Sequence, residues 1–315
     1  MRWLAAIVVV IGCGGAPDAP ARLEEVADIP DTGQDLPAAF DTDDTLVLMD
    51  GSSGLRRLVG DRLLSIPNGS QFSFGTIGLD RDGQLLLGSS NFTQLARLEP
   101  ADTLAFIDPP PPTSFTRIAA TPSGAYHILP FGAVTTLALA PGALTWVDSM
   151  LGLDRTLRAP DGTIYAVLDG DIVTLGGDDS PTVVASCAEF AGGTCPGLEL
   201  AGVDSAGHLH MALSGLPEVH VLDPAAGSYR EIALPGELVI EAMVTGSQHA
   251  IVMANDPERG NERSLWLLPD GGDQLLRFAT VGSPFEFGFV RVLVDRSGNA
   301  FLISRGKLQR IVVDG

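Results

Sequence analysis

The chain has 315 residues and a formal net charge of −20, from 39 acidic and 19 basic side chains. Such a charge excludes nucleic acid as a partner, because binding it requires clustered Lys and Arg that displace counterions from the phosphates. The same charge repels anionic lipid headgroups, so a basic surface cannot attach this chain to a membrane.

The chain begins with a processing segment. Residues 3–11 form an apolar run behind Arg2, too short to span a bilayer, which takes roughly 20 apolar residues. A basic residue, a short apolar stretch and a small residue at its end are the layout of a secretory signal. The residues Val10-Ile11-Gly12-Cys13 resemble the lipobox of bacterial lipoproteins, which implies that Cys13 is acylated, for example with palmitate, and becomes the first mature residue. An ordinary signal peptide with an incidental cysteine is the alternative.

Three segments follow from this interpretation: a signal peptide over 1–12, a lipidated cysteine and tether over 13–36, and one domain over 37–315. Proline and acidic residues give the tether the composition of a flexible spacer, although Arg22–Ile29 is expected to be ordered. No later segment has about 18 consecutive apolar residues. We therefore expect an exported protein, held at the outer membrane or cell surface of a bacterial envelope by its N-terminal lipid alone.

A turn followed by an apolar run recurs through residues 37–315. Asp-Gly and Ser-Gly pairs favour tight hairpins, because the central positions of these turns need positive φ. Apolar runs of three to five residues follow each turn and are typical of strands buried on both faces. The turn positions are 44, 83, 124, 162, 207, 248 and 298.

A period of about forty residues with four strands in each unit predicts a β-propeller. The units resemble those of NHL-type and gluconolactonase-like propellers, whose blades carry a similar Asp-x-x-Gly turn before an apolar strand. We expect an all-β fold of seven four-stranded blades, with six blades or an array of β-sandwiches as alternatives. The last unit has three strands, and Arg22–Ile29 is expected to supply the fourth and close the ring.

Two cysteines remain if Cys13 is acylated. Cys187 and Cys195 would be in an oxidising compartment, where a disulfide is the expected state. The residues between them are typical of a loop, and their spacing does not fit a CxxC redox or zinc motif.

The long connections of the predicted blades fall on one face. If the strands are labelled A to D from the centre outward, the insertions at 108–115, 187–195, 255–264 and 282–289 all fall in B–C or D–A connections, where binding usually resides on a rigid scaffold. Nine phenylalanines lie in or beside the same connections: Phe72, Phe74, Phe92, Phe115, Phe131, Phe190, Phe285, Phe287 and Phe289. They form either an exposed interaction surface or a cover for the channel mouth and the blade ends.

A column of charged residues lies near the start of the predicted innermost strands, and it includes Arg117, Arg155, Glu241 and Arg291. Arginines around a channel mouth could bind a carboxylate or phosphate. Pairing of these arginines with acids such as Asp154 and Glu241 is the alternative.

Catalytic and metal-binding signals are weak. His208 and His210 have the spacing of two metal ligands, but no third ligand is identifiable. Four aspartates at the turns, Asp41, Asp43, Asp80 and Asp82, lack the spacing of a calcium loop. Gluconolactonase-like propellers hold a divalent cation, such as calcium, over the channel, but its ligands do not map onto this sequence. We therefore expect no cofactor, with calcium as the alternative.

The sequence favours a monomeric binding module for another envelope protein, an extracellular protein or a small ligand. Phe285, Phe287 and Phe289 would supply contact area, and Arg117, Arg155, Arg291 and Glu241 would supply selectivity. A metal-dependent lactonase, another hydrolase or a lyase is the alternative, because propellers also support catalysis.

Overall fold

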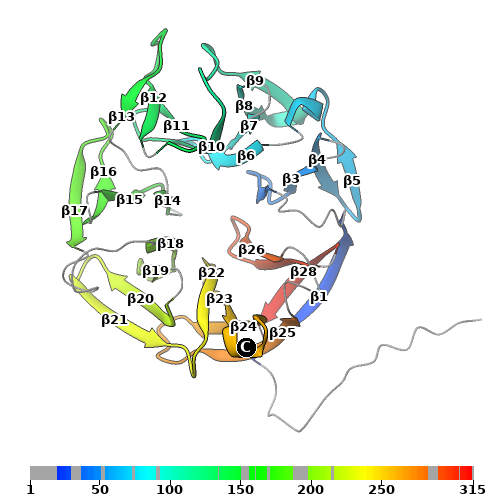
Figure 1. Ribbon diagram of the computed structural model, residues 1–315, viewed down its shortest axis with the longest axis vertical. Coiled ribbons are helices and arrows are strands. Elements are labelled where there is room, and N and C mark those ends of the chain that lie inside the picture. The colour runs from blue at the N-terminus through cyan, green and yellow to red at the C-terminus, as the bar shows by residue number, and fades with distance from the viewer. Residues whose placement is uncertain are drawn as a thin grey trace, which may run out of the picture.

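The computed structural model describes residues 20–29, 37–50, 54–72, 75–89, 93–133, 135–149, 156–159, 161–168, 171–186, 198–213, 216–282, 290–304 and 306–313. These residues form seven antiparallel sheets of four strands each, arranged in a ring (Figure 1). The chain is a seven-bladed β-propeller, as the repeat predicted, and the alternative of six blades is wrong. Among the described residues, no helix is long and apolar enough to cross a membrane.

Blades 1 to 6 each use four consecutive strands, with the first strand innermost. The strands of blades 1 to 3 are β2 (Ala38–Phe40), β3 (Leu46–Asp50), β4 (Gly54–Val59) and β5 (Arg62–Ser65); β6 (Gly75–Leu79), β7 (Leu85–Ser89), β8 (Gln94–Glu99) and β9 (Thr103–Phe106); and β10 (Phe115–Ala120), β11 (Tyr126–Pro130), β12 (Thr136–Leu139) and β13 (Val147–Ser149).

Blades 4 to 6 have the same arrangement. Their strands are β14 (Thr156–Arg158), β15 (Ile164–Leu168), β16 (Asp171–Leu175) and β17 (Pro181–Ser186); β18 (Leu198–Val203), β19 (Leu209–Leu213), β20 (Glu218–Asp223) and β21 (Ser228–Ala233); and β22 (Val239–Thr245), β23 (His249–Asp256), β24 (Glu262–Pro269) and β25 (Leu276–Gly282). Among the described residues, three short 3-10 helices lie in the connections: η1 (Gly69–Phe72), η2 (Pro100–Asp102) and η4 (Pro257–Arg259).

Blade 7 joins the two ends of the chain. It consists of β26 (Val290–Val294), β27 (Ala300–Ser304), β28 (Lys307–Val313) and β1 (Ala21–Asp28), and β1 pairs antiparallel with β28 along its length. Figure 1 shows the blue β1 beside the red β28. Ile29, just after β1, donates its amide to the carbonyl of Gly306 at 2.8 Å. The predicted closure by an N-terminal strand is confirmed, and it removes an open sheet edge.

The A–B turns owe their shape to aspartate and glycine. Asp80 Oδ1 accepts hydrogen bonds from the amides of Asp82 and Gln84, at 2.8 and 2.7 Å, and Asp204 Oδ1 binds the amides of Ala206 and His208 in the same way. Glycine provides the positive φ at the turn position, for example +78° at Gly83. An aspartate begins this turn in blades 1, 2, 5 and 7, so residues around the turn can be compared directly between these four blades.

The hydrophobic core is a ring of clusters, most of them between adjacent blades. The second strands β3, β7 and β19 are buried at every position, as the continuous apolar runs predicted. One cluster combines Leu198 and Met211 of blade 5 with Tyr165 and Ile172 of blade 4. Each blade is therefore stabilised chiefly by its neighbours, and the innermost strands are left to line the centre.

Candidate functional site

A cavity of about 290 Å³ lies between the innermost strands of blades 2, 3 and 4. Its wall comes from β6, β10 and β14, and it includes Thr76, Asp80, Arg117 and Arg158. Arg117 lies toward the start of β10, on the side of the D–A connections, and Arg158 ends β14, on the side of the A–B turns. The cavity thus has an arginine toward each end of the channel.

The predicted charged column is carried by innermost strands. Arg117, Glu241 and Arg291 lie in β10, β22 and β26, whereas Arg155 lies outside the described residues. Glu241 Oε2 accepts a hydrogen bond from Arg263 Nε at 2.7 Å, and both side chains are partly buried. Arg263 belongs to β24 of the same blade and was not among the predicted residues. Glu241 therefore has a structural partner within its own blade. Among the described residues, the cations of this column are Arg117 and Arg291.

A second group of arginines lies at the opposite mouth of the channel, on the A–B side. The guanidinium of Arg296, from the A–B turn of blade 7, donates to the carbonyl oxygen of Gly83 in blade 2. Arg158 also lies close to Gly83: its Nε is 3.7 Å from the position that a β-carbon would occupy if Gly83 were alanine. Side chains from blades 4 and 7 thus converge on one turn of blade 2. Guanidinium groups that share one small region favour an anion, because they repel one another unless a negative charge lies between them.

The phenylalanines do not form one set. Phe72 and Phe115 are fully buried in the core, so of the two interpretations the exposed interaction surface does not hold for these two residues. Phe72 lies in η1 and stacks on Phe106 with ring centroids 6.4 Å apart. Phe131, which follows β11, is 80% exposed. Phe74, Phe92, Phe190, Phe285, Phe287 and Phe289 are not among the described residues, nor are Cys13, Cys187 and Cys195.

Two of the four insertions fall within the described part of the chain. Residues 108–115 are fixed against blade 3, because Trp146 Nε1 donates to the carbonyl oxygens of Pro109 and Pro110 at 3.1 Å. Residues 255–264 contain η4, whose first amides are capped by Asp256. The topology places both insertions in the connection classes that the sequence predicted, D–A for 108–115 and B–C for 255–264.

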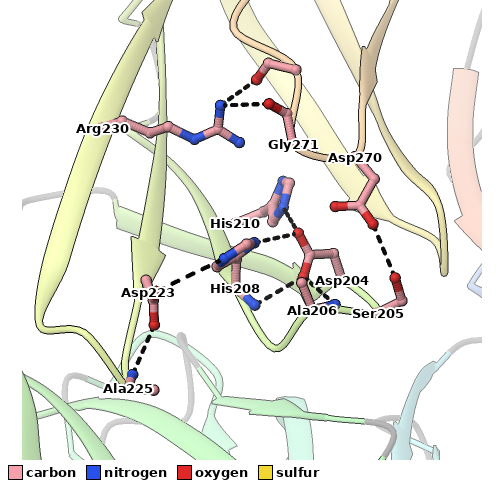
Figure 2. A network of polar contacts seen from close by, with 11 residues as sticks. Asp204, Ser205, Ala206, His208, His210, Asp223, Ala225, Arg230, Asp270 and Gly271 are labelled. Carbon is pink, nitrogen blue, oxygen red and sulfur yellow. Dashed lines mark hydrogen bonds and ion pairs between the residues drawn. The ribbon is translucent and has the colours of Figure 1, made fainter.

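A polar cluster on the other face combines blades 5 and 6. Asp204 Oδ2 lies 3.0 Å from His208 Nδ1 and 3.1 Å from His210 Nε2 (Figure 2). Asp270, in the C–D turn of blade 6, accepts a hydrogen bond from Ser205 Oγ at 2.9 Å. Burial opposes the charged form of Asp204, but hydrogen bonds from the His208 amide and from both histidines outweigh it and lower the pKa of Asp204 to about 2. Burial lowers the pKa of His210 below its ordinary value.

Sequence analysis identified the two histidines of this cluster but found no third ligand. Asp204 and Asp270 are far apart in the chain and come together only because blade 5 packs against blade 6. An alignment of the repeats could have pointed to them, because blade 5 has Val221 where blades 1, 2 and 7 have an arginine.

No protein-family model matches this sequence, and no curated protein matches it. Solved structures do resemble it. Virginiamycin B lyase from Staphylococcus aureus has a TM-score of 0.62 and 8% identity, over 93% of this chain and 100% of its own. YCF48 bound to the D1 peptide has a TM-score of 0.58 and 14% identity, over 95% and 97%. The chain shares the propeller fold with these proteins.

A third similar structure is the extracellular domain of a hybrid two-component system from B. thetaiotaomicron. Its TM-score is 0.59 and its identity 14%, over 92% of this chain and 42% of that one. Identities this low show the fold alone, and propellers with one fold serve as enzymes, peptide binders and extracellular domains.

Proposed function

We propose that this chain is an exported, lipid-anchored β-propeller that binds an envelope protein or an extracellular ligand. The binding surface consists of the B–C and D–A connections and the adjoining end of the channel. The observation that carries the proposal is the cavity between β6, β10 and β14, with Arg117 on this side, in a chain whose net charge is −20. A cationic pocket in an acidic molecule selects for a ligand that brings a carboxylate or another anionic group.

Binding would combine two kinds of contact. Arg117 and Arg291 would orient an anionic group, since a guanidinium matches a carboxylate with two parallel hydrogen bonds. Phe285, Phe287 and Phe289, which the sequence places in the last D–A connection, would supply apolar contact area. The peptide bound by YCF48 and the extracellular domain with this fold support such a role by analogy.

The anchor supports the location that we propose. The first described strand begins at Ala21, so only a short spacer separates it from Cys13. Two or more acyl chains on that cysteine would give stable membrane attachment. Growth with a labelled fatty acid should label the wild type and not Cys13→Ser, and the variant should leave the membrane fraction. Equal labelling of both forms would contradict the anchor.

A pull-down from detergent-solubilised envelope tests the binding surface. The bait begins at Gly14 and therefore retains every described strand. Phe285→Ser with Phe287→Ser removes the predicted apolar contacts, and Arg117→Gln removes the cation. Leu144→Ser is the matched control, because Leu144 is 85% exposed in the C–D turn of blade 3, on the opposite face. We expect one partner with wild type and the control, and loss of that partner with the other variants. Equal capture by all baits, or capture by none, would contradict the proposal.

The alternative is a metal-dependent hydrolase or lyase. The polar cluster around Asp204 favours this function, because carboxylate and imidazole ligands on an exposed face can hold an ion that activates water. That cluster lies on the A–B face, away from Arg117, so the two functions predict effects of different variants.

A further inference from the structure

The A–B turns of four blades begin with an aspartate, and three of these blades carry an arginine at the same position of the C strand. The aspartates are Asp41, Asp80, Asp204 and Asp295 in blades 1, 2, 5 and 7. In each of these blades, the second residue of the B strand pairs with a residue of the neighbouring C strand. That C-strand residue is Arg57 in blade 1, Arg97 in blade 2 and Arg310 in blade 7. In blade 5 the same register position is Val221, opposite His210. The arginine forms an ion pair with the turn aspartate in blades 1 and 2, whereas in blade 7 Arg310 donates to Asn299, which donates to Asp295. Blade 5 has no arginine at this position.

The junction of blades 1 and 2 shows what that arginine does. Arg57 binds Asp41 through Nη1, and its Nε lies 2.6 Å from Asp102 Oδ1. Asp41 belongs to the A–B turn of blade 1, and Asp102 to the C–D turn of blade 2. One guanidinium thus neutralises two carboxylates from neighbouring blades.

The junction of blades 5 and 6 has the same two carboxylates without the arginine. Asp204 takes the place of Asp41, and Asp270 lies in the C–D turn of the following blade, as Asp102 does. Arg230 approaches this turn but binds the carbonyl oxygens of Gly271 and Gly272. The side chains in direct contact with Asp204 Oδ2 are the two histidines, which both point toward it (Figure 2).

We propose that Asp204, His208 and Asp270 bind a divalent transition-metal ion, with Zn²⁺ the best fit, between blades 5 and 6. The ion would take the electrostatic place that Arg57 takes between blades 1 and 2. One ligand atom from each residue lies within 4.8 Å of the other two. Ligand atoms around a tetrahedral zinc ion are about 3.4 Å apart, given bonds of about 2.0 to 2.2 Å. A movement of up to about 1.4 Å closes the set, and Asp270 can move because it is exposed in a turn.

The donor set selects the class of ion. An imidazole with two carboxylates suits zinc and its neighbours, whereas calcium and magnesium prefer oxygen ligands alone. His208 Nε2 lies 4.0 Å from Asp223 Oδ2, so a metal on Nδ1 would leave the other ring nitrogen facing a carboxylate. That arrangement orients metal-binding histidines in many proteins. His210 remains a partner of Asp204 and holds its carboxylate in place.

Three protein ligands leave a coordination position for water or an external ligand. Asp204 is buried, His208 is partly exposed and Asp270 is exposed, so the open position faces solvent on the A–B side. The site is independent of the proposed partner surface, which lies on the opposite face. It gives this propeller a second place where an extracellular ligand can bind.

Calorimetric titration with Zn²⁺ tests the site. The protein is the untagged chain from Gly14, compared with His208→Gln, Asp270→Asn and the control Asp273→Asn. Asp273 lies in the same turn as Asp270 and is also exposed, and Asp273→Asn changes the net charge by the same amount as Asp270→Asn. We expect one Zn²⁺ per wild-type chain, Kd at least about tenfold weaker in His208→Gln and Asp270→Asn, and Kd within about twofold of wild type in the control. Excess Ca²⁺ should not displace the ion.

Three outcomes would overturn the proposal: no stoichiometric binding to the wild type, unchanged Kd in both ligand variants, or equal weakening by Asp273→Asn. The last would show that Zn²⁺ binds the acidic surface without a defined site. Melting curves without metal check that each variant is folded, and Zn²⁺ should raise the melting temperature of wild type and the control only.

Discussion

Replacement of Ile29 by alanine tests how the N-terminal strand closes the ring. Ile29 is 6% exposed and packs with Phe40 and Leu48 of blade 1 and with Ile303 of blade 7. Truncation of a buried isoleucine to alanine costs about 2 to 5 kcal/mol, because apolar area is lost and a cavity remains. For a domain of this size, each kcal/mol lowers the melting temperature by about 2 °C. We therefore expect a fall of about 4 to 10 °C in calorimetry.

Val26→Ala is the matched control for this prediction. Val26 belongs to β1 itself but is 39% exposed, and the register of β1 on β28 shifts beside it. Surface truncations of this kind change stability by about 0.5 kcal/mol or less. Equal melting temperatures for wild type and Ile29→Ala, or equal falls in both variants, would refute the view that this strand and the residue after it stabilise blades 7 and 1 together.

Three further predictions concern stability. Gly78→Ala should lower the free energy of unfolding by about 1 to 3 kcal/mol, because the new β-carbon would overlap the carbonyl oxygen of Ile118. Gly177→Ala is the control and should leave the stability unchanged, because a β-carbon there meets no other atom within 4 Å. Equal urea midpoints for the two variants would contradict this. Burial lowers the pKa of His127, so the unfolded chain binds the proton more readily and the protein loses stability as the pH drops through about 6.5. Between about pH 7.5 and 5.5, the melting temperature of His127→Gln should therefore fall less than that of the wild type. Parallel plots of melting temperature against pH for the two proteins would be evidence against this. Cys187→Ser should cost about 2 to 3 kcal/mol if Cys187 and Cys195 form a disulfide, and free thiols in the unfolded, unreduced protein would rule the bond out.

The fold could be predicted because its signals are local and repeated. Asp-Gly turns, buried apolar runs and a period of about forty residues each depend on a few neighbouring residues, and seven copies reinforce one another. Ring closure was also predictable, since three strands in the last unit left one place for the segment around Arg22–Ile29. Burial of the connections was harder to predict. The 3-10 helix η1 packs against blades 1 and 2 and buries Phe72. Nothing in the local sequence around Phe72 distinguishes this residue from the exposed Phe131.

The contacts between blades could not be predicted from spacing. Asp204 meets Asp270, and Arg158 meets the Gly83 turn, only because the ring brings the turns of different blades together. Glu241 was predicted at the channel mouth, but its pairing with Arg263 depends on how two strands of blade 6 are aligned. Such pairings depend on the exact register of the paired strands, and a structure is needed to determine it.

Photo-crosslinking in intact cells tests the central claim, that the face of the B–C and D–A connections binds a partner. A photoreactive residue replaces Phe287 in one full-length variant and Leu144, on the opposite face, in another. The account predicts a discrete crosslinked partner from position 287 and none from position 144. A partner only from position 144, or none from either, would contradict it.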